Sequence, residues 1–303
     1  MTFSAGDAAF EGFRVVRRSP MTLVFWSLAY LVFMVALFAA IGGPMIALMA
    51  EAQRVGASGG AATPDQLEPF MMAYLSVLPL LIPISLFFSA ILAAAVVRAV
   101  LEPERKAFGY LRLGMDEVRV AVVSLVLGIL GFVIYMTLSM FVGTVGGLAA
   151  AAMGGEGAAM LPVMLAFLVV VAVMIWLIAR FSLAVPITVA EKRMAFFDSF
   201  RMTKGRSLPI VGMAIIAWVM AMVVGLLGFL VCLPLIFAVG GFSRLTEMEG
   251  ASSMEIAQAL GPVVVVFLVV QALLASLQLA VLYAPFSAAY RDLRGSRTEG
   301  PPA

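Results

Sequence analysis

Few side chains in this sequence could carry out acid, base or nucleophilic chemistry. The chain has no histidine and one cysteine, Cys232, which excludes a disulfide framework and a zinc site built on histidines or several cysteines. Among the segments rich in lysine and arginine, the close acidic pairs are Asp116–Glu117 and Glu102–Glu104, which stand beside arginines and lysines. We expect these carboxylates to form a solvated, locally paired surface. The sequence therefore predicts no catalytic residue, no metal site, no cofactor and no enzymatic activity.

Basic side chains recur in a short signature that suits phosphate or partner binding. Three segments, 10–14, 108–112 and 197–201, read aromatic residue, two variable residues, large apolar residue, arginine. At helical spacing, the ring of each segment could rest at the acyl boundary while its arginine reaches lipid phosphates. The candidate binding residues are Arg14, Arg112, Arg201 and the nearby Lys204. They are either flanks that stop transfer and set topology, or a basic collar that binds anionic lipids or partner membrane proteins.

Two further sets of polar residues lie inside or beside long apolar stretches. Arg180 follows an apolar run and precedes the apolar segment 181–190. Its guanidinium either snorkels to interfacial phosphates, or anchors a phosphorylated lipid headgroup or an ion pair. Gln271 and Gln278 lie seven residues apart on one face of the last apolar run. They predict hydrogen bonds between packed helices or, alternatively, a polar path through the membrane.

The elements that must position these side chains are membrane helices. The 303 residues are 64% apolar and 12% charged, whereas soluble proteins are about half apolar and a quarter charged. The net charge of +2 gives no argument for nucleic-acid binding. Six apolar runs exceed the roughly 20 residues that a membrane-spanning helix needs; they cover 21–49, 70–97, 120–151, 160–187, 208–242 and 261–290. The sequence predicts an all-α polytopic membrane protein with six transmembrane helices in one integral membrane domain, 1–303.

The charges assign the ends of these helices to opposite sides of the membrane. Of the 19 lysines and arginines, 17 lie near the termini and in alternate loops, together with 10 of the 17 acidic residues. The other loops hold only Arg54 and Arg244 against seven acidic residues. Because cytoplasmic loops carry the excess of lysine and arginine, both termini are predicted to be cytoplasmic.

The signature also divides the chain into three internal repeats. Each repeat would consist of one interfacial amphipathic helix and one transmembrane hairpin, over about 4–101, 102–190 and 191–293. Residues 294–303 are predicted to form a disordered tail.

Capping residues and helix breakers refine this picture. Ser4 to Asp7 and Thr188 to Glu191 have the spacing of capping boxes, and Gly114 and Gly205 stand where a left-handed residue would end a helix. Glycines and prolines inside the long runs predict kinks and close helix packing, or else broken helices that line a path. They include Gly42, Gly43, Pro44, Pro79, Pro83, Gly143, Gly146, Gly147, Gly225, Gly228 and Pro234.

Two segments carry a resemblance to a known family. Residues 180–209 read RFSLAVP…AEKRMAFFDSFRMTKGRSLP, and residues 289–293 read AYRDL. They resemble the membrane-domain family of bacterial glycerophosphodiester phosphodiesterases. The resemblance implies a six-helix module of the bacterial inner (plasma) membrane that in some relatives precedes a soluble phosphodiesterase domain. It carries no catalytic residue over to this chain.

These observations favour a non-enzymatic multi-pass inner-membrane module that engages anionic lipids or partner proteins through its basic cytoplasmic collar. The alternative is a transporter or channel for a small or lipidic substrate, which the repeats, the helix breakers and the two glutamines motivate.

Overall fold

The computed structural model describes residues 4–57, 63–153, 156–238 and 253–298 and shows six long helices among them. They are α3 (Pro20–Ala57), α4 (Pro64–Leu101), α5 (Met115–Met153), α6 (Glu156–Phe181), α9 (Ser207–Ala238) and α11 (Ser253–Thr298). Each of the six contains a stretch that is long and apolar enough to cross a membrane. The chain is therefore an all-α multi-pass membrane protein, as its sequence predicts.

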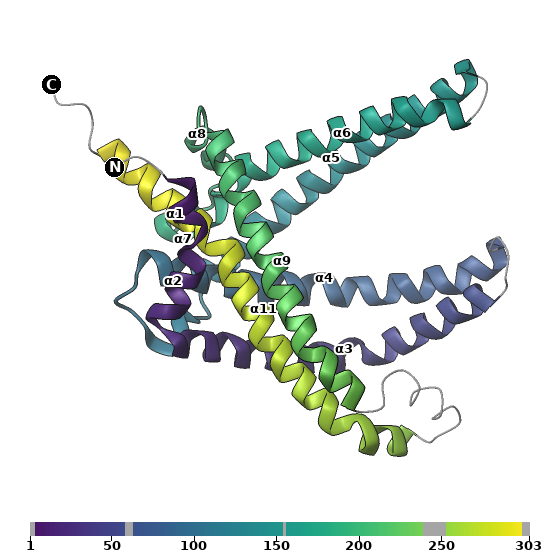
Figure 1. The fold of residues 1–303 in the computed structure, drawn as a ribbon, viewed down its shortest axis with the longest axis horizontal. Coiled ribbons are helices and arrows are strands. Elements are labelled where there is room, and N and C mark those ends of the chain that lie inside the picture. Colours follow the sequence, from purple (N-terminus) through teal and green to yellow (C-terminus); the bar gives the residue numbers. More distant parts are fainter. Residues whose placement is uncertain (1–3, 58–62, 154–155, 239–252, 299–303) are drawn as a thin grey trace.

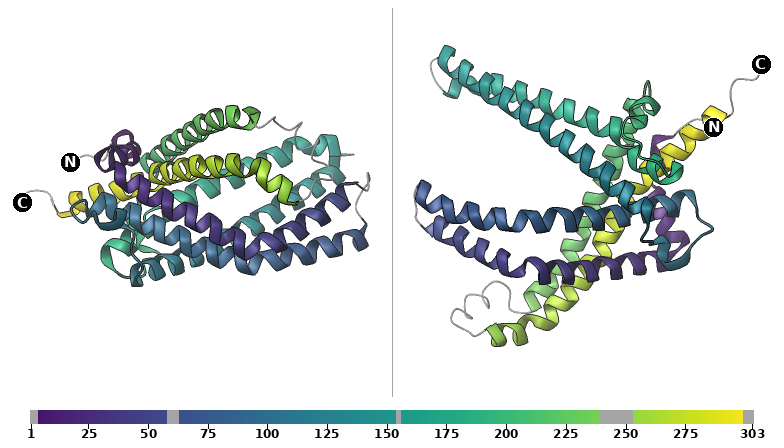
Figure 2. Two further views of the ribbon diagram at one scale, coloured as in Figure 1. Left: turned by 90° about the horizontal axis from the view of Figure 1, so that it is seen from below. Right: turned by 180° about the vertical axis from the view of Figure 1, so that it is seen from behind.

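The long helices pair into three hairpins, α3–α4, α5–α6 and α9–α11, which diverge from one another (Figure 1). In the left view of Figure 2, the far ends of all three hairpins point the same way. The first and last described residues lie at the opposite end. We call this opposite end the basic end, because it gathers the segments that hold 17 of the 19 basic residues. Helix α11 is central to the fold and contacts α3, α4, α9 and the short helix α2 (Glu11–Arg18).

Five short helices lie at the basic end. They are α1 (Ala5–Ala9), α2 (Glu11–Arg18), the 3-10 turn η1 (Ala107–Tyr110), α7 (Ala184–Glu191) and α8 (Asp198–Met202). The Ser4 side chain accepts a hydrogen bond from the Asp7 N–H, which confirms the predicted cap at the start of α1. Gly205 has φ +79°, as expected for a left-handed residue after α8.

Two of the predicted helix signals are wrong. Thr188 lies inside α7, where its hydroxyl donates to the Ala184 carbonyl at 2.7 Å and accepts from the Ala195 N–H at 3.3 Å. It therefore joins α7 to the loop that follows and does not begin a helix. Gly114 directly precedes α5, so it stands at the start of a helix and not at the end of one.

The segments that precede the three hairpins also differ in conformation. The first signature starts at Phe10, between α1 and α2, and continues into α2; the third starts at Phe197, the residue before α8, and continues into α8. The second lies in η1, where Phe108, Gly109 and Tyr110 have φ of 50°, 64° and 64°. This turn is not the amphipathic helix that the sequence predicts, because its left-handed residues reverse the chain within a few positions. At the other end of the chain, α11 continues to Thr298, inside the predicted tail; 299–303 lie outside the described residues.

Proline does not end any of the long helices in the described part of the chain. Helix α3 continues through Pro44, and α4 continues through Pro79 and Pro83. Three of the predicted glycines, Gly146, Gly225 and Gly228, mark close approaches between helices, as the packing interpretation expects, whereas Gly43, Gly143 and Gly147 have nothing within 4 Å. A Cβ atom on Gly228 of α9 would lie 2.2 Å from the Leu274 side chain of α11. One on Gly146 of α5 would lie 3.0 Å from Val163 of α6.

The protein core is concentrated at the basic end. Trp26, Leu92, Leu183, Ile210 and Tyr290 are almost completely buried there. By contrast, only 11% of the most apolar stretch of α5 is buried, and the same holds for α6. The basic end thus provides a rigid base for polar side chains, while the hairpins present apolar surface to the membrane.

Candidate functional site

The three signatures share a pattern of exposure even though their backbones differ. The first aromatic side chain is exposed in each: Phe10 is 42%, Phe108 75% and Phe197 65% accessible. The third position, Gly12, Tyr110 or Ser199, is buried in each. Each signature therefore turns one residue toward the core and one aromatic ring outward.

Local packing explains the buried positions. Because Gly12 has no side chain, α2 can lie directly on α11; a Cβ atom there would come within 2.6 Å of the Ala280 oxygen and the Val281 Cα. In the third signature, the Ser199 hydroxyl donates to the Arg180 carbonyl at 2.6 Å and accepts from the Leu183 N–H at 3.1 Å. These contacts fix α2 and α8 on the ends of the long helices.

The predicted collar residues divide into a paired arginine and three unpaired cations. Arg14 lies 3.2 Å from both Glu11 and Asp7. The hydrogen bond to Glu11 raises the pKa of Arg14 further above its ordinary value. Arg112, Arg201 and Lys204 are exposed, and the structure shows no ion pair for their side chains within its described ranges. These three are the collar residues that remain able to bind an anion.

Glu11 is a buried acceptor that sequence reasoning missed. Its side chain is only 3% accessible, and its carboxylate oxygens lie 3.2 Å from Arg14, 3.6 Å from Arg18 and 3.6 Å from Arg291. Since Arg291 belongs to α11, this carboxylate joins α2 to the last helix. The apolar surroundings lower the local dielectric and strengthen these interactions.

A buried ion pair joins α4 to α5, and it corrects the expectation of a solvated carboxylate for Glu117; Glu102 and Asp116 pair locally, with Arg105 and Arg119, as expected. Arg98 and Glu117 are 3% and 1% accessible, and an arginine nitrogen lies 2.5 Å from a carboxylate oxygen. Arg98 also donates to the Tyr110 carbonyl at 3.2 Å, and Glu117 accepts from the Gly114 N–H at 2.9 Å. The spacing of Gly114 and Glu117, three residues apart at a helix start, could have predicted the hydrogen bond between these two residues, but not the contact with Arg98.

Arg180 lies at the end of α6 and binds protein groups. It donates to the Phe200 carbonyl and to the Thr203 hydroxyl, both at 3.3 Å. Its guanidinium carbon lies 4.4 Å from the centre of the Phe200 ring and 5.4 Å from that of Trp176. Its Nε is buried without a hydrogen-bond partner in the described structure. Among the described residues no carboxylate pairs with it, and its contacts attach α8 to α6.

The two glutamines lie in different environments. Gln278 donates from its side-chain amide to the Ala221 carbonyl of α9 at 3.2 Å. Gly225 makes room for it, since a Cβ atom there would lie 2.6 Å from the Gln278 nitrogen. Gln271 is exposed on α11. The contact of Gln278 is the interhelical hydrogen bond that the sequence offers as one of two interpretations.

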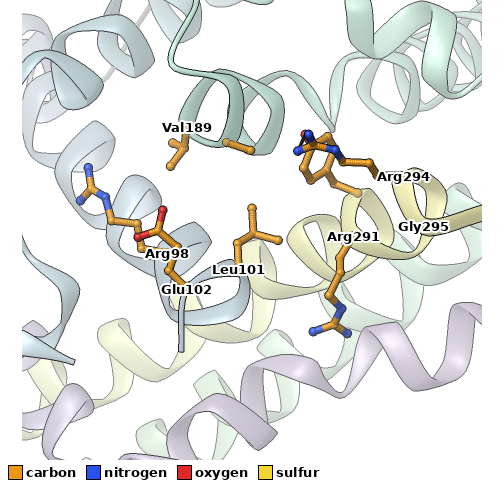
Figure 3. Close-up of a pocket in the computed structure, with 9 residues that line it drawn as sticks. Arg98, Leu101, Glu102, Val189, Arg291, Arg294 and Gly295 are labelled. Atoms are coloured by element: carbon orange, nitrogen blue, oxygen red, sulfur yellow. Dashed lines mark hydrogen bonds between the residues drawn. The ribbon is translucent and has the colours of Figure 1, made fainter. Parts of the chain in front are cut away.

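Two neighbouring cavities open at the basic end. The larger, about 440 Å³, lies between the ends of α4, α7 and α11. Figure 3 shows that the guanidinium groups of Arg98 and Arg291 turn away from it, whereas Arg294 stays beside it. Arg98 and Arg291 form ion pairs with Glu117 and Glu11. The smaller, about 280 Å³, lies between α7, α8 and α11 and is lined by Arg201 and Arg294. Tyr290 and Arg294 line both cavities.

The structure thus brings Arg201 to a cavity together with Tyr290 and Arg294, two residues that were not predicted to be part of a site. Arg112 and Lys204 do not line either of the two cavities described here. The sequence also contains one Gly-x-Ser-x-Gly run, Gly56 to Gly60. That run in hydrolases needs a strand-turn-helix setting and a histidine base; here its first two residues belong to the end of α3, the other three lie outside the described residues, and the chain has no histidine.

No family model matches the chain, and no curated protein or solved structure matches it. The resemblance to the glycerophosphodiester phosphodiesterase membrane domains therefore stays a prediction from residues 180–209 and 289–293.

Proposed function

We propose that the protein is a non-enzymatic module of a bacterial inner membrane that binds anionic lipids at its basic end. In this proposal, the basic end and both termini face the cytoplasm. The observation that carries it is that one end of the molecule holds both exposed aromatic side chains and cations that have no carboxylate partner among the described residues.

The aromatic side chains support an interfacial position. Phe10, Phe108 and Phe197 extend from three separate segments of the basic end. Exposed aromatic rings near the ends of membrane helices favour the boundary between headgroups and acyl chains. There an apolar ring can leave water without entering the hydrocarbon centre. The headgroups of the cytoplasmic leaflet would then lie beside the basic collar.

The unpaired cations support a preference for anionic headgroups. Arg112, Arg201 and Lys204 are exposed and, over the described ranges, have no ion pair. Each basic residue near an anionic membrane surface contributes about 1 kcal/mol of attraction. Arg14 contributes less in this proposal, because Glu11 and Asp7 already neutralise it.

The contact of Gln278 favours a packing role over transport. The nitrogen of its side-chain amide donates to a backbone carbonyl of the neighbouring helix, so this glutamine supports the hairpin α9–α11. We therefore do not include transport in the proposal.

A charge-matched pair of variants tests the proposal. The double variant Arg112→Gln and Lys204→Gln lowers the net charge by two at the basic end, and Arg54→Glu lowers it by two at the other end. Each protein is placed in nanodiscs of phosphatidylcholine with a minor share of phosphatidylglycerol, and the lipids retained by the protein are counted by native mass spectrometry. We expect phosphatidylglycerol to be enriched around the wild type and the Arg54 variant, and several-fold less around the double variant.

Equal enrichment around all three proteins, or none around the wild type, would contradict the proposal. Unchanged lipid counts together with loss of one co-purifying protein from the double variant would assign the basic collar to a protein partner instead.

A further inference from the structure

Building on the proposed function, we propose that the smaller cavity binds one phosphodiester group of an anionic headgroup through Arg201 and Arg294. The group could belong to a membrane lipid or to its water-soluble, deacylated headgroup, and the two sources share the same charge and shape at the phosphorus.

The size of the cavity suits a headgroup. Its volume is about 280 Å³. That is enough for a phosphate with a glycerol substituent, and it is below the usual range for drug-sized ligands, about 300–1,000 Å³. Acyl chains would have to stay outside, in the membrane.

Two guanidinium groups of the cavity are available to an anion. Arg201, on α8, is exposed, and the described structure gives its side chain no partner. Arg294, on α11, donates only to the Tyr290 hydroxyl, at 3.1 Å, and the described residues place no carboxylate within ion-pair distance of it. Arginine binds phosphate oxygens with two parallel hydrogen bonds, so two arginines can hold both free oxygens of a phosphodiester.

The acidic residues of the cavity set the charge that it can accept. Arg193 lies 2.7 Å from both Glu191 and Asp198, so two carboxylates share one guanidinium and leave one negative charge uncompensated. Arg201 and Arg294 add two positive charges, which gives the cavity a net charge of about +1. A singly charged phosphodiester matches this value, whereas a phosphomonoester approaching two negative charges exceeds it.

Tyr290 positions one of the two arginines. Its hydroxyl accepts the hydrogen bond from Arg294 and donates to Glu191 at 3.4 Å. Tyr290 is itself 2% accessible. Because Tyr290 is buried, its hydroxyl holds the Arg294 side chain at the cavity. This hydrogen bond lowers the entropic cost of ordering Arg294 when a ligand binds.

The surroundings of the cavity give a lipid access to it. Phe197, one turn before Arg201, is 65% accessible, and Met194 is 47% accessible. These apolar side chains can lie among the acyl chains while the headgroup enters between α7, α8 and α11.

The test uses full-length protein in maltoside detergent and three soluble probes. They are dihexanoyl phosphatidylglycerol, dihexanoyl phosphatidic acid and glycerophosphoglycerol, titrated by isothermal calorimetry. We expect phosphatidylglycerol to bind more tightly than phosphatidic acid. Arg201→Gln and Arg294→Gln should each weaken phosphatidylglycerol binding about fivefold. Glu191→Gln, which raises the charge of the cavity, should reduce the preference over phosphatidic acid.

The control is the double variant Arg105→Gln and Lys106→Gln, which removes two charges from the same end outside the smaller cavity. It should bind phosphatidylglycerol within twofold of the wild type. Unchanged binding by the double variant Arg201→Gln and Arg294→Gln, with unchanged thermal stability, would overturn the inference. Glycerophosphoglycerol binding as tightly as phosphatidylglycerol would assign the site to a soluble ligand.

The two proposals can fail separately. If the cavity variants bind normally while the Arg112 and Lys204 double variant loses lipid enrichment, the cavity is not the site but the proposed function stands. If the cavity variants lose probe binding while the wild type shows no enrichment in nanodiscs, the site stands and the proposed function is wrong.

Discussion

The basic end and the far halves of the hairpins pack in opposite ways. At the basic end, Trp26, Leu183 and Ile210 are completely buried, whereas Phe132 and Met140 of α5 are 61% and 75% accessible. Charged groups at the basic end also reach the interior, as Glu11 and Glu117 do. The comparison indicates that the basic end is specified by side-chain packing as in a soluble domain, while the hairpins rely on the membrane to cover their apolar surface.

This difference in packing also indicates which part of the molecule can form a binding site. A pocket with fixed polar groups needs a rigid support, and the two cavities described above lie where the packing is dense. The exposed apolar surface of α5 and α6 places the molecule in the membrane and provides few polar groups for recognition.

The largest effect should come from breaking the buried ion pair of the basic end. Glu117→Gln leaves Arg98 charged, buried and without its closest carboxylate, and should lower the free energy of unfolding by about 3–5 kcal/mol. Glu104→Gln changes an exposed acid of the same region and should stay within about 0.5 kcal/mol. Unfolding by sodium dodecyl sulfate in mixed micelles measures both variants. A Glu117 variant as stable as the Glu104 variant would show that packing alone holds α4 against α5.

A smaller effect should follow from adding one methyl group at matched glycines. Gly12→Ala places a Cβ against the backbone of α11 at 2.6 Å and should cost about 1–3 kcal/mol, because helix α2 must shift. Gly131→Ala in α5 meets nothing within 4 Å and should be neutral or stabilise the helix by up to about 1 kcal/mol. Thermal unfolding in detergent compares the two. Equal losses of stability in the two variants would show that the basic end is no more tightly packed than the hairpins.

The smallest effect should separate the two glutamines of α11. Gln278→Leu loses the hydrogen bond to the Ala221 carbonyl and should destabilise the protein by about 0.6 kcal/mol, the average for such bonds in membranes. Gln271→Leu changes an exposed residue and should leave stability unchanged in detergent. Flux of a fluorescent solute through proteoliposomes provides the second measurement. A specific loss of flux in either variant, with stability intact, would revive the transporter alternative.

The spans could be predicted from the sequence because hydrocarbon thickness fixes the length of a helix whatever its packing. The common direction in which the far ends of the hairpins point also followed from the charges. The start of α1 was predictable because Ser4 caps it through a contact within three residues. These properties depend on residues that are close together in the sequence.

The site was less predictable, because its residues come from distant parts of the chain. Arg98 and Glu117 occur in charged or apolar stretches that give no sign of their contact, and they meet only after η1 reverses the chain. Arg201 was named from its signature, but its neighbours Tyr290 and Arg294 come from a helix almost ninety residues later. Thr188 failed as a cap because its hydroxyl binds a loop across the helix end, a contact that tertiary structure decides.

The most direct test of the account is the side of the membrane on which the basic end lies. Cys232 is the only cysteine and is replaced by serine, after which single cysteines are placed at two exposed positions, Lys204→Cys at the basic end and Gln53→Cys near the end of α3. Bacterial cells with a permeabilised outer membrane are treated with a maleimide that cannot cross the inner membrane. The account predicts labelling of position 53 in intact inner membranes, and of position 204 only after they are lysed. Labelling of position 204 in intact inner membranes would contradict it.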